Sequence, residues 1–218
     1  MALDPRVYQQ LDEINIIKHK PLIISDADEV LVHFAKPLEL FLDEFDMSIA
    51  FTSYKLFGNV RYKSSNEKVP KEQVFELLQR FFIEKVHTCP AVEGVCAALE
   101  RLSENYQIII LSNTPYDARE QRIKALNNIG INFPLIANDG HKGPAVKALY
   151  AAASAQTVFL DDIPHHHTSV ATSAPEVQRI HFVADQRLAK LLEPATDSHT
   201  RIDNWREAET YIENYFKR

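Results

Sequence analysis

Short, uninterrupted apolar runs recur along the chain and end in small or acidic residues. The runs are PLIISD (21–26), YQIIILSN (106–113), INFPLIAND (131–139), TVFLDD (157–162) and VQRIHFV (177–183). They are rich in β-branched or aromatic residues and do not alternate between apolar and polar positions. This pattern is typical of strands that are buried on both faces of a parallel sheet.

Segments with helical periodicity separate most of these runs. VEGVCAALERL (92–102) precedes the second run, DAREQRIKALNNIG (117–130) follows it, and GPAVKALYAAAS (143–154) precedes the fourth. Gly130 stands where a helix C-terminus favours glycine. The amphipathic segment 202–216 predicts a final helix that Trp205 holds against the sheet. This alternation of strands and helices predicts an α/β fold with a doubly wound parallel sheet.

One interval breaks the alternation. About 80 residues separate the first apolar run from the second, far more than an ordinary crossover connection contains. Its ends, 36–45 and 70–85, have helical patterns, and Pro70 suits a first helical turn. The middle, 51–68, is polar and aromatic and is expected to form a loop. We expect 35–90 to be a small α-helical insertion over the carboxyl end of the sheet, where such sheets bind ligands, and 1–34 and 91–218 to be the core.

Composition narrows the possible classes of protein. The 218 residues carry 24 basic and 30 acidic side chains, and the net charge of −6 argues against binding to a nucleic acid polymer or to a membrane through a basic surface. No apolar stretch approaches the roughly 18 residues of a membrane span, and MALDPRVYQQ does not begin like a secretory signal. Cys89 and Cys96 lack the spacing of zinc or redox sites and are expected to be ordinary thiols of a cytoplasmic protein.

Two of the apolar runs end in pairs of acidic residues. Asp26 and Asp28 follow the first run, and Asp161 and Asp162 end the fourth. If these strands are neighbours in one parallel sheet, four carboxylates gather at its carboxyl edge, and their repulsion calls for a hard cation. Ligation by oxygen alone suits Mg²⁺, which usually shares a substrate phosphate. The alternative is that these aspartates only cap the turns or helices that follow.

Groups that bind anions accompany the acidic pairs. The second run ends in Ser112, Asn113 and Thr114, whose hydroxyl and backbone N–H groups are expected at the same edge of the sheet. Lys142 begins the helix before the fourth run, and Lys147 is the other lysine that is able to take its role. A hydroxyl and a lysine beside a metal held by carboxylates are what phosphoryl transfer requires.

The order of these motifs (DxD, an apolar run with SNT, a lysine, an apolar run with DD) resembles the haloacid dehalogenase-like superfamily. The resemblance is to its Mg²⁺-dependent phosphatases, which have a Rossmann-like core and a helical cap between the first and second motifs. It covers 20–34 and 92–185 and includes all four motifs in order. It implies a hydrolase of phosphate monoesters, with a phosphotransferase or phosphomutase of the same superfamily as the alternative.

The resemblance also implies roles for individual residues. Asp26 matches the nucleophile that forms an aspartyl-phosphate. Asp28 matches the general acid that protonates the leaving oxygen and then activates water, and its backbone carbonyl matches a Mg²⁺ ligand. Asp162 matches the direct metal ligand, and Asp161 matches a water-mediated or supporting one. The groups that match the phosphate-binding positions are Ser112, Asn113 and Lys142.

Two features depart from the pattern of that superfamily. Glu29 and Val30 follow the DxD motif where relatives often have Gly-Thr, and a bulky acid at the first position is expected to alter the turn. Three histidines, 165–167, follow the DD pair, and His166 stands four residues after Asp162, where many relatives have Asn or Asp. Adjacent side chains diverge, so these histidines cannot all bind one ion. Three interpretations stay open: solvated loop histidines, one histidine in contact with the substrate or supporting a ligand, and a zinc or iron site.

The insertion is expected to select the substrate. Tyr54, Lys55 and Arg61 lie in its polar, aromatic middle and are the predicted contacts with the leaving group. The alternative is that these residues only pack the insertion. A lid of this size encloses a small organic phosphate and obstructs a folded protein or a duplex, so a small phosphorylated metabolite is the expected partner. The sequence does not indicate an oligomeric state.

Two non-enzymatic classes share parts of the pattern. A receiver-type module also combines an acceptor aspartate, an acid pair, a hydroxyl and a lysine, but its acid pair comes on the first strand and it has no place for the insertion. A catalytically idle relative that is retained as a binding protein fits the same motifs. Turnover of an aryl phosphate with Mg²⁺ separates an enzyme from both classes.

Overall fold

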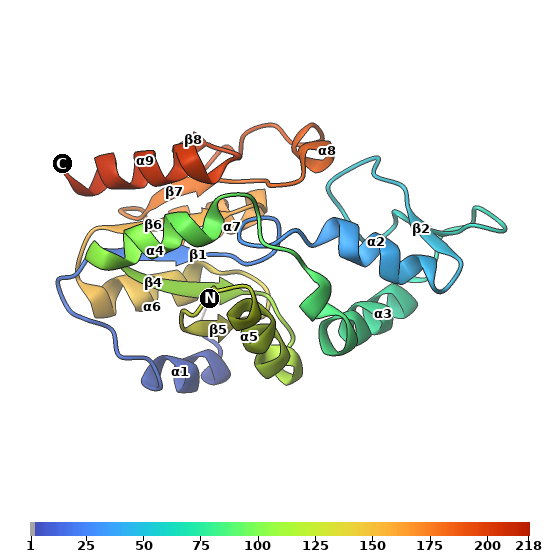
Figure 1. Cartoon of the computed structure of the whole chain (residues 1–218), viewed down its shortest axis with the longest axis horizontal. Helices are drawn as coiled ribbons and strands as arrows, with labels where there is room; N and C mark the ends of the chain where they lie inside the picture. Colours follow the sequence, from blue (N-terminus) through green and yellow to red (C-terminus); the bar gives the residue numbers. More distant parts are fainter. Residues whose placement is uncertain (1–2) are drawn as a thin grey trace.

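The computed structural model describes residues 3–218 and is built around a six-stranded sheet (Figure 1). All of its strand pairs are parallel, and the strand order is β5-β4-β1-β6-β7-β8. The strands are β1 (Leu22–Ser25), β4 (Gln107–Ser112), β5 (Leu135–Ala137), β6 (Thr157–Asp161), β7 (Gln178–His181) and β8 (Thr200–Arg201). Each predicted apolar run contains one of the first five of these strands. β8 was not predicted, because two residues are too few for a pattern.

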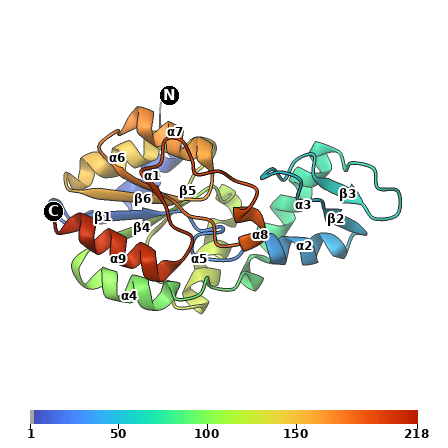
Figure 2. The same ribbon diagram turned by 90° about the horizontal axis from the view of Figure 1, so that it is seen from above.

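Helices cover both faces of the sheet, which confirms the doubly wound α/β fold (Figures 1 and 2). On one face, Ile23 and its neighbours pack against α4 (Val95–Asn105), α5 (Arg119–Asn128) and α9 (Trp205–Phe216). On the other face, Leu22 and Ile24 pack against α1 (Pro5–Asp12), α6 (Gly143–Ala153) and α7 (Pro164–Ser173). Successive residues of β1 therefore face opposite layers, which explains why its sequence is apolar throughout.

Trp205 holds the last helix on the core, as expected. Its side chain is fully buried, and its indole N–H donates a hydrogen bond to the Val30 carbonyl at 2.8 Å. The ring also packs against Phe182, with 5.5 Å between the ring centroids. The short helix α8 (Gln186–Ala189) lies in the connection that precedes β8. Trp205 thus joins the C-terminal helix to the segment that follows β1.

The long interval between β1 and α4 forms a separate group of elements beyond the carboxyl ends of the strands (Figures 1 and 2). It contains α2 (Ala35–Asp43), β2 (Met47–Ile49), β3 (Val60–Tyr62), α3 (Lys71–Glu84) and the 3₁₀ helix η1 (Val86–Thr88). Both predicted helices are present. The expectation that 51–68 is a loop throughout was wrong, because β3 lies inside it and pairs antiparallel with β2. A three-residue strand is too short for its alternation to be seen in the sequence.

Aromatic side chains pack the two helices of the insertion together. Phe81 of α3 makes edge-to-face contacts with Phe34 and Phe41, with ring centroids 5.2 Å and 5.6 Å away. Phe82 stacks on the other side of Phe34 at 5.5 Å. Such pairs stabilise a core beyond the area that they bury. The buried side chains of the insertion, Phe41 and Phe81 among them, form one continuous apolar cluster with those of the sheet, Ile23 among them.

The two cysteines are free thiols, Cys89 buried and Cys96 half-buried, as expected. Burial raises the pKa of the Cys89 thiol to about 12, so this thiol is unreactive at neutral pH. Over residues 3–218, no helix has the length and apolar character needed to cross a membrane.

Candidate active site

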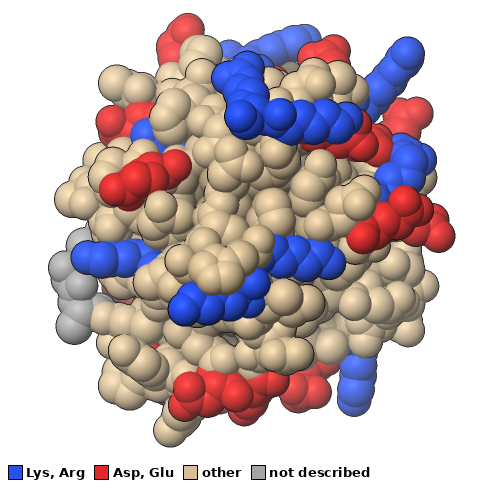
Figure 3. Space-filling model, turned by 90° about the vertical axis from the view of Figure 1, so that its left-hand side faces the viewer, with Lys and Arg blue, Asp and Glu red and all other residues tan. Residues whose placement is uncertain are grey.

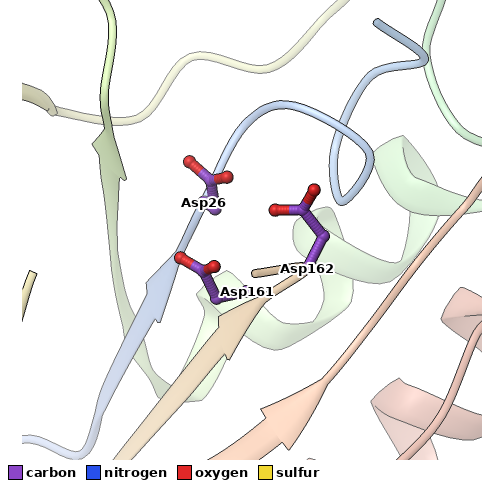
Figure 4. A group of neighbouring side chains, drawn as sticks. All are labelled: Asp26, Asp161 and Asp162. Atoms are coloured by element: carbon purple, nitrogen blue, oxygen red, sulfur yellow. The ribbon is translucent and has the colours of Figure 1, made fainter. Parts of the chain in front are cut away.

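Three aspartates meet at the carboxyl ends of β1 and β6 (Figure 4). Ser25 of β1 lies opposite Leu160 of β6, and the backbone N–H of Asp26 donates to the Leu160 carbonyl at 2.9 Å. The side chains of Asp26, Asp161 and Asp162 follow at this edge, and each offers a carboxylate oxygen within 4.8 Å of the others. All three residues are buried. The pairing of β1 with β6 thus brings the two acidic motifs together, as predicted.

Lys142 lies in the middle of this cluster. Its Nζ atom is 2.7 Å from Asp26 Oδ1 and 2.7 Å from Asp161 Oδ2, and its side chain is buried. Burial alone would lower the pKa of Lys142, but the charges of Asp161 and Asp26 outweigh it and raise the pKa, so the ammonium keeps its proton. Lys147 is exposed on α6. Of the two lysines left open by the sequence, the structure places Lys142 in the site.

A close contact between two helices positions Lys142. Gly143 begins α6 directly after this lysine, and its backbone N–H donates to Ser169 Oγ of α7 at 3.0 Å. A Cβ atom on Gly143 would lie 2.2 Å from the Ser169 carbonyl oxygen, so only glycine fits here. The N-terminus of α6 is therefore held at a fixed distance from α7, with Lys142 facing the strand ends.

The cluster carries more negative charge than Lys142 neutralises. Burial and the neighbouring charges of Asp161 and Asp26 raise the pKa of Asp162 well above its usual range. Asp161 is already bonded on both oxygens, by Lys142 and by the backbone N–H of Ile163 at 2.8 Å. Within residues 3–218, the buried Oδ1 atom of Asp162 has no hydrogen-bond partner. These oxygens fit a hard divalent cation such as Mg²⁺, which prefers carboxylates and would add the missing positive charge.

Asp28 does not join the other three aspartates, contrary to the prediction that four carboxylates gather. Its Oδ1 accepts a hydrogen bond from Nη2 of Arg122, a fully buried side chain of α5. Burial raises the pKa of Asp28 to about 6, although Arg122 opposes this rise. The carboxylate turns from the cluster because the buried guanidinium offers it an opposite charge, whereas the other aspartates repel it.

Arg122 is a site residue that was missed in the sequence. It lies on the buried face of α5 with Ala125 and Leu126, and its guanidinium carbon is 5.2 Å from the centroid of the Phe82 ring. Within the described chain, its Nε and Nη1 atoms have no hydrogen-bond partner. The available signal was a charged residue on the apolar face of a predicted amphipathic helix.

Glu29, the unusual residue after the DxD motif, joins three segments. Its Oε1 accepts hydrogen bonds from the backbone N–H groups of Phe34 and Ala35, at 2.8 Å and 2.7 Å, where α2 begins. Its Oε2 accepts from the N–H of Asp185, before α8, at 3.0 Å. The backbone of Glu29 is left-handed, with φ 55°, a conformation that costs about 1–2 kcal/mol without glycine. Where the sequence predicted only an altered turn, Glu29 therefore forms a buried connection between the core and the insertion.

The predicted phosphate-binding residues lie at the neighbouring strand end. Ser112 ends β4 and is buried, with its Oγ 3.0 Å from Thr114 Oγ1. The amide of Asn113 donates to the Gly140 carbonyl at 2.9 Å and accepts from Asn138 at 2.8 Å. Ser112 and Asn113 are thus set at the same carboxyl edge as the aspartates, and local hydrogen bonds orient them.

The three histidines do not lie in a loop and two of them are buried, which corrects the interpretation that they are solvated loop residues. They lie in the first turn of α7, where His166 and His167 are fully buried and only His165 is exposed. His166 Nε2 is 3.5 Å from the Asn113 amide nitrogen, and His167 Nε2 is 3.0 Å from the Asp161 carbonyl oxygen. Burial lowers the pKa of both rings, so they stay neutral. Helix α7 packs against β6, which removes His166 and His167 from water.

Of the three predicted leaving-group contacts, only Tyr54 reaches the cluster. Its hydroxyl donates a hydrogen bond to Asp162 Oδ2. Lys55 is exposed, and the Arg61 guanidinium donates to the Asn66 carbonyl at 2.8 Å within the insertion. The contacts of Lys55 and Arg61 with a substrate stay predictions.

Comparison with known proteins relates this geometry to a fold. No protein-family model matches the chain, and no curated protein sequence does. A haloacid dehalogenase-like family hydrolase from Streptococcus pneumoniae has a similar structure, with a TM-score of 0.61 at 14% identity over 89% of this chain and 98% of the other. A predicted phosphoglycolate phosphatase from Haemophilus somnus gives 0.60 at 14% identity, over 91% and 100% of the two chains.

A third similar structure is a haloacid dehalogenase superfamily hydrolase of subfamily IA, variant 1, from Geobacter sulfurreducens. Its TM-score is 0.52 at 16% identity, and the match covers 90% of this chain and 96% of the other. These similarities span the sheet and the insertion alike. The chain therefore has the Rossmann-like α/β fold of the haloacid dehalogenase-like hydrolases, with its acidic cluster at the carboxyl edge of the sheet.

Proposed function

We propose that this protein is a Mg²⁺-dependent phosphatase that hydrolyses small organic phosphate monoesters through an aspartyl-phosphate. The observation that carries the proposal is the buried cluster of Asp26, Asp161 and Asp162, with Lys142 2.7 Å from two of the three. Asp26, Asp162 and the backbone carbonyl of Asp28 would hold the cation, with Asp161 in support. When bound, the cation neutralises charge on the phosphoryl oxygens.

Asp26 and Asp28 carry out the two chemical steps in this proposal. A carboxylate oxygen of Asp26 attacks phosphorus, and the bond to the leaving oxygen breaks while Asp28 gives that oxygen a proton. Asp28 then takes a proton from water, which attacks the phosphorus of the aspartyl-phosphate. The bond between phosphorus and Asp26 breaks, and inorganic phosphate leaves. Asp28 must release Arg122 at least in part to reach the leaving oxygen.

Ser112, Asn113 and Lys142 bind the phosphoryl group in this proposal. Lys142 keeps its charge next to both Asp26 and Asp161, so it stays available for the oxygens of the transferred group. Ser112 and Asn113 approach from the end of β4, the strand that pairs with β1 on the side away from β6. The phosphoryl group would therefore lie over β1, between donors from one neighbouring strand and the metal ligands of the other.

The insertion acts as the cap in this proposal and limits the substrate to a small phosphorylated metabolite. The Tyr54 hydroxyl already contacts Asp162, so the insertion leaves little room for a folded protein or a duplex at the three aspartates. Lys55, Arg61 and His166 remain candidates for contacts with the leaving group. A nucleic acid polymer and a membrane are not expected partners, and a cytoplasmic location is proposed on the grounds given by the sequence.

Turnover of an aryl phosphate by the purified chain tests this function. We expect release of inorganic phosphate that requires Mg²⁺ and stops with a chelator. Asp26→Asn should lower the rate at least about 100-fold while the protein stays folded, because the amide keeps the shape and loses the nucleophile. Asp139→Asn, at an exposed aspartate beyond the end of β5, is the matched control and should keep full activity.

Three outcomes of this experiment contradict the proposal. Asp26→Asn with more than a tenth of the wild-type rate would exclude the covalent route. Transfer of phosphate to a second metabolite, with little inorganic phosphate released, would identify a phosphotransferase or phosphomutase. A wild-type protein that binds Mg²⁺ but turns over no phosphate ester would be a catalytically idle binding protein.

A further inference from the structure

A tyrosine of the insertion contacts one of the aspartates that the proposed function assigns to the metal. The Tyr54 hydroxyl donates to Asp162 Oδ2, whereas Asp162 Oδ1 is buried and has no partner within residues 3–218. A tyrosine phenol is protonated at neutral pH, so it acts as the donor in this contact. One oxygen of Asp162 is therefore held by the insertion, and the other is left for a cation.

Asn59 shapes the loop that presents Tyr54. This buried side chain donates through Nδ2 to the Ser53 carbonyl at 3.1 Å and to the Lys55 carbonyl at 2.7 Å, on either side of Tyr54. Its Oδ1 accepts from Thr52 Oγ1 at 3.0 Å. Because one amide ties both flanks of Tyr54, the loop between β2 and β3 has a fixed shape despite its lack of regular structure.

The same loop packs against the core. Phe51 and Tyr54 pack against a small apolar cluster. Its buried members are Ala35 of α2 and three residues of the segment around α8: Val183, Leu188 and Ala189. The Arg187 guanidinium lies 5.2 Å from the centroid of the Phe51 ring and also pairs with Glu39 of α2 at 3.0 Å. The segment 183–192 thus supports both the loop and the first helix of the insertion.

We propose that Tyr54 is a positioning residue through which the insertion orients Asp162 for metal binding. The inference rests on the proposed metal site and goes beyond it, because it makes a residue outside the core motifs part of that site. A carboxylate held through one oxygen presents the other in a fixed direction. Partners that orient metal ligands in this way typically change metal affinity 10–100-fold when they are removed.

Metal binding and the packing of the insertion on the core are then linked. If the packed insertion strengthens metal binding, the metal strengthens this packing by the same factor, since the two equilibria share one thermodynamic cycle. Addition of Mg²⁺ should therefore slow hydrogen exchange at backbone amides of 51–59. The sequence placed Tyr54 among leaving-group contacts, and the structure favours this different role because its hydroxyl is already committed to Asp162.

Metal binding without substrate tests the inference. Binding of Mg²⁺ is measured by calorimetry and that of Mn²⁺ by electron paramagnetic resonance, for wild type, Tyr54→Phe and Tyr62→Phe. We expect Tyr54→Phe to weaken binding about tenfold. Tyr62→Phe is the matched control, because it removes one hydroxyl that bonds Gln73 inside the insertion at 2.6 Å, and it should bind like wild type.

A second variant tests the presentation of the hydroxyl. Asn59→Ala leaves Tyr54 intact but removes the bonds that shape its loop, so it should weaken metal binding and speed exchange at 51–59 even with Mg²⁺ present. Unchanged binding by Tyr54→Phe would overturn the inference, and so would tighter binding, because the hydroxyl would then be irrelevant or would compete with the metal. If the wild type binds neither ion, the proposed metal site itself fails.

Discussion

Lys142 lies between Asp26 and Asp161, and Arg122 pairs with Asp28, so each of these five charged side chains contacts an opposite charge. Buried charges persist only with such partners. Asp162 differs, because the charges of Asp161 and Asp26 outweigh that of Lys142 in raising its pKa, and within residues 3–218 its carboxylate accepts a hydrogen bond only from the neutral Tyr54 phenol. At the scale of residues, four aspartates thus face two cations, and Asp162 is the aspartate without an ion pair within residues 3–218.

The contact between Asp28 and Arg122 leads to a prediction about catalysis. Arg122→Met should lower kcat about tenfold and change KM little, because the carboxylate loses the partner that orients it rather than a contact with substrate. The fold should survive, since methionine fills similar space. The substitution removes the ion pair, but it also removes two guanidinium nitrogens that are buried without a hydrogen-bond partner within residues 3–218, and this offsets part of the lost stability. Steady-state kinetics and thermal unfolding measure the two effects.

A double-mutant cycle identifies the route by which Arg122 acts. In an Asp28→Asn background, Arg122→Met should cause no further loss of kcat, because residues that act as a unit are not additive. Equal losses in both backgrounds would show that Arg122 serves the reaction independently of Asp28.

At the scale of elements, the start of α2 shows how the insertion is attached. Phe34 is at the N-cap and gives no side-chain hydrogen bond, and the first N–H groups of α2 are instead satisfied by Glu29 from the core. A carboxylate at a helix N-terminus is also favoured by the helix dipole. One residue thus serves as the distant cap of α2 and as the support of the segment before α8.

Loss of this carboxylate should weaken the junction. Glu29→Gln keeps the size of the side chain but replaces an accepting oxygen with an NH₂ group, which cannot accept from an N–H. We expect a loss of about 1–3 kcal/mol in the free energy of unfolding, measured by denaturant titration. The matched control is Glu72→Gln, an exposed carboxylate in the first turn of α3, which should change stability by less than about 0.5 kcal/mol. Similar effects of both substitutions would contradict the role of Glu29.

At the scale of the whole molecule, the buried acidic cluster lies at the carboxyl edge of the sheet, next to the insertion. The end of the molecule opposite the insertion carries Lys, Arg, Asp and Glu side chains that are interspersed with uncharged ones (Figure 3). Beneath the acidic cluster, His167 and His181 contact the backbone carbonyls of Asp161 and Asp162, each at 3.0 Å. Neutral imidazoles therefore support the strand end that carries the acidic pair.

This arrangement predicts a loss of stability in mild acid. His181 accepts the Ala195 N–H at Nδ1 and donates from Nε2 to the Asp162 carbonyl, and burial lowers its pKa to about 4. Between the ordinary histidine pKa near 6.5 and this value, the unfolded chain binds a proton that the folded chain does not. Stability should therefore fall as pH falls through this window, by up to about 3 kcal/mol from His181.

Unfolding measured at several pH values checks this prediction. His181→Gln should be less stable than wild type at pH 7, and its stability should depend less on pH between about 6.5 and 4. His87→Gln, at an exposed histidine of η1, should keep the wild-type profile. Equal pH profiles for wild type and His181→Gln would contradict it.

Much of the core follows from local sequence. The five apolar runs could be identified because strands buried on both faces need continuous apolar residues, and helices such as α4 and α6 because one apolar stripe faces the sheet. The order of the motifs then predicted Asp26, Asp161 and Lys142 at one edge, since parallel strands present their carboxyl ends on the same side. β8 and the pairing of β2 with β3 were not predicted, because these strands of two or three residues do not lie in a longer apolar run like the one that indicated β5.

The fold class thus follows from the order and periodicity of residues along the chain, and so does the meeting of Asp26, Asp161 and Asp162 at one edge of the sheet, although Asp28 was wrongly expected to join them. The partner of each buried charge, in contrast, follows from the tertiary packing. Arg122 reaches Asp28 across 94 positions, Tyr54 reaches Asp162 across 108, and Glu29 reaches Asp185 across 156. Such pairings depend on which elements pack side by side, and a charged or polar residue by itself does not show which distant group will satisfy it.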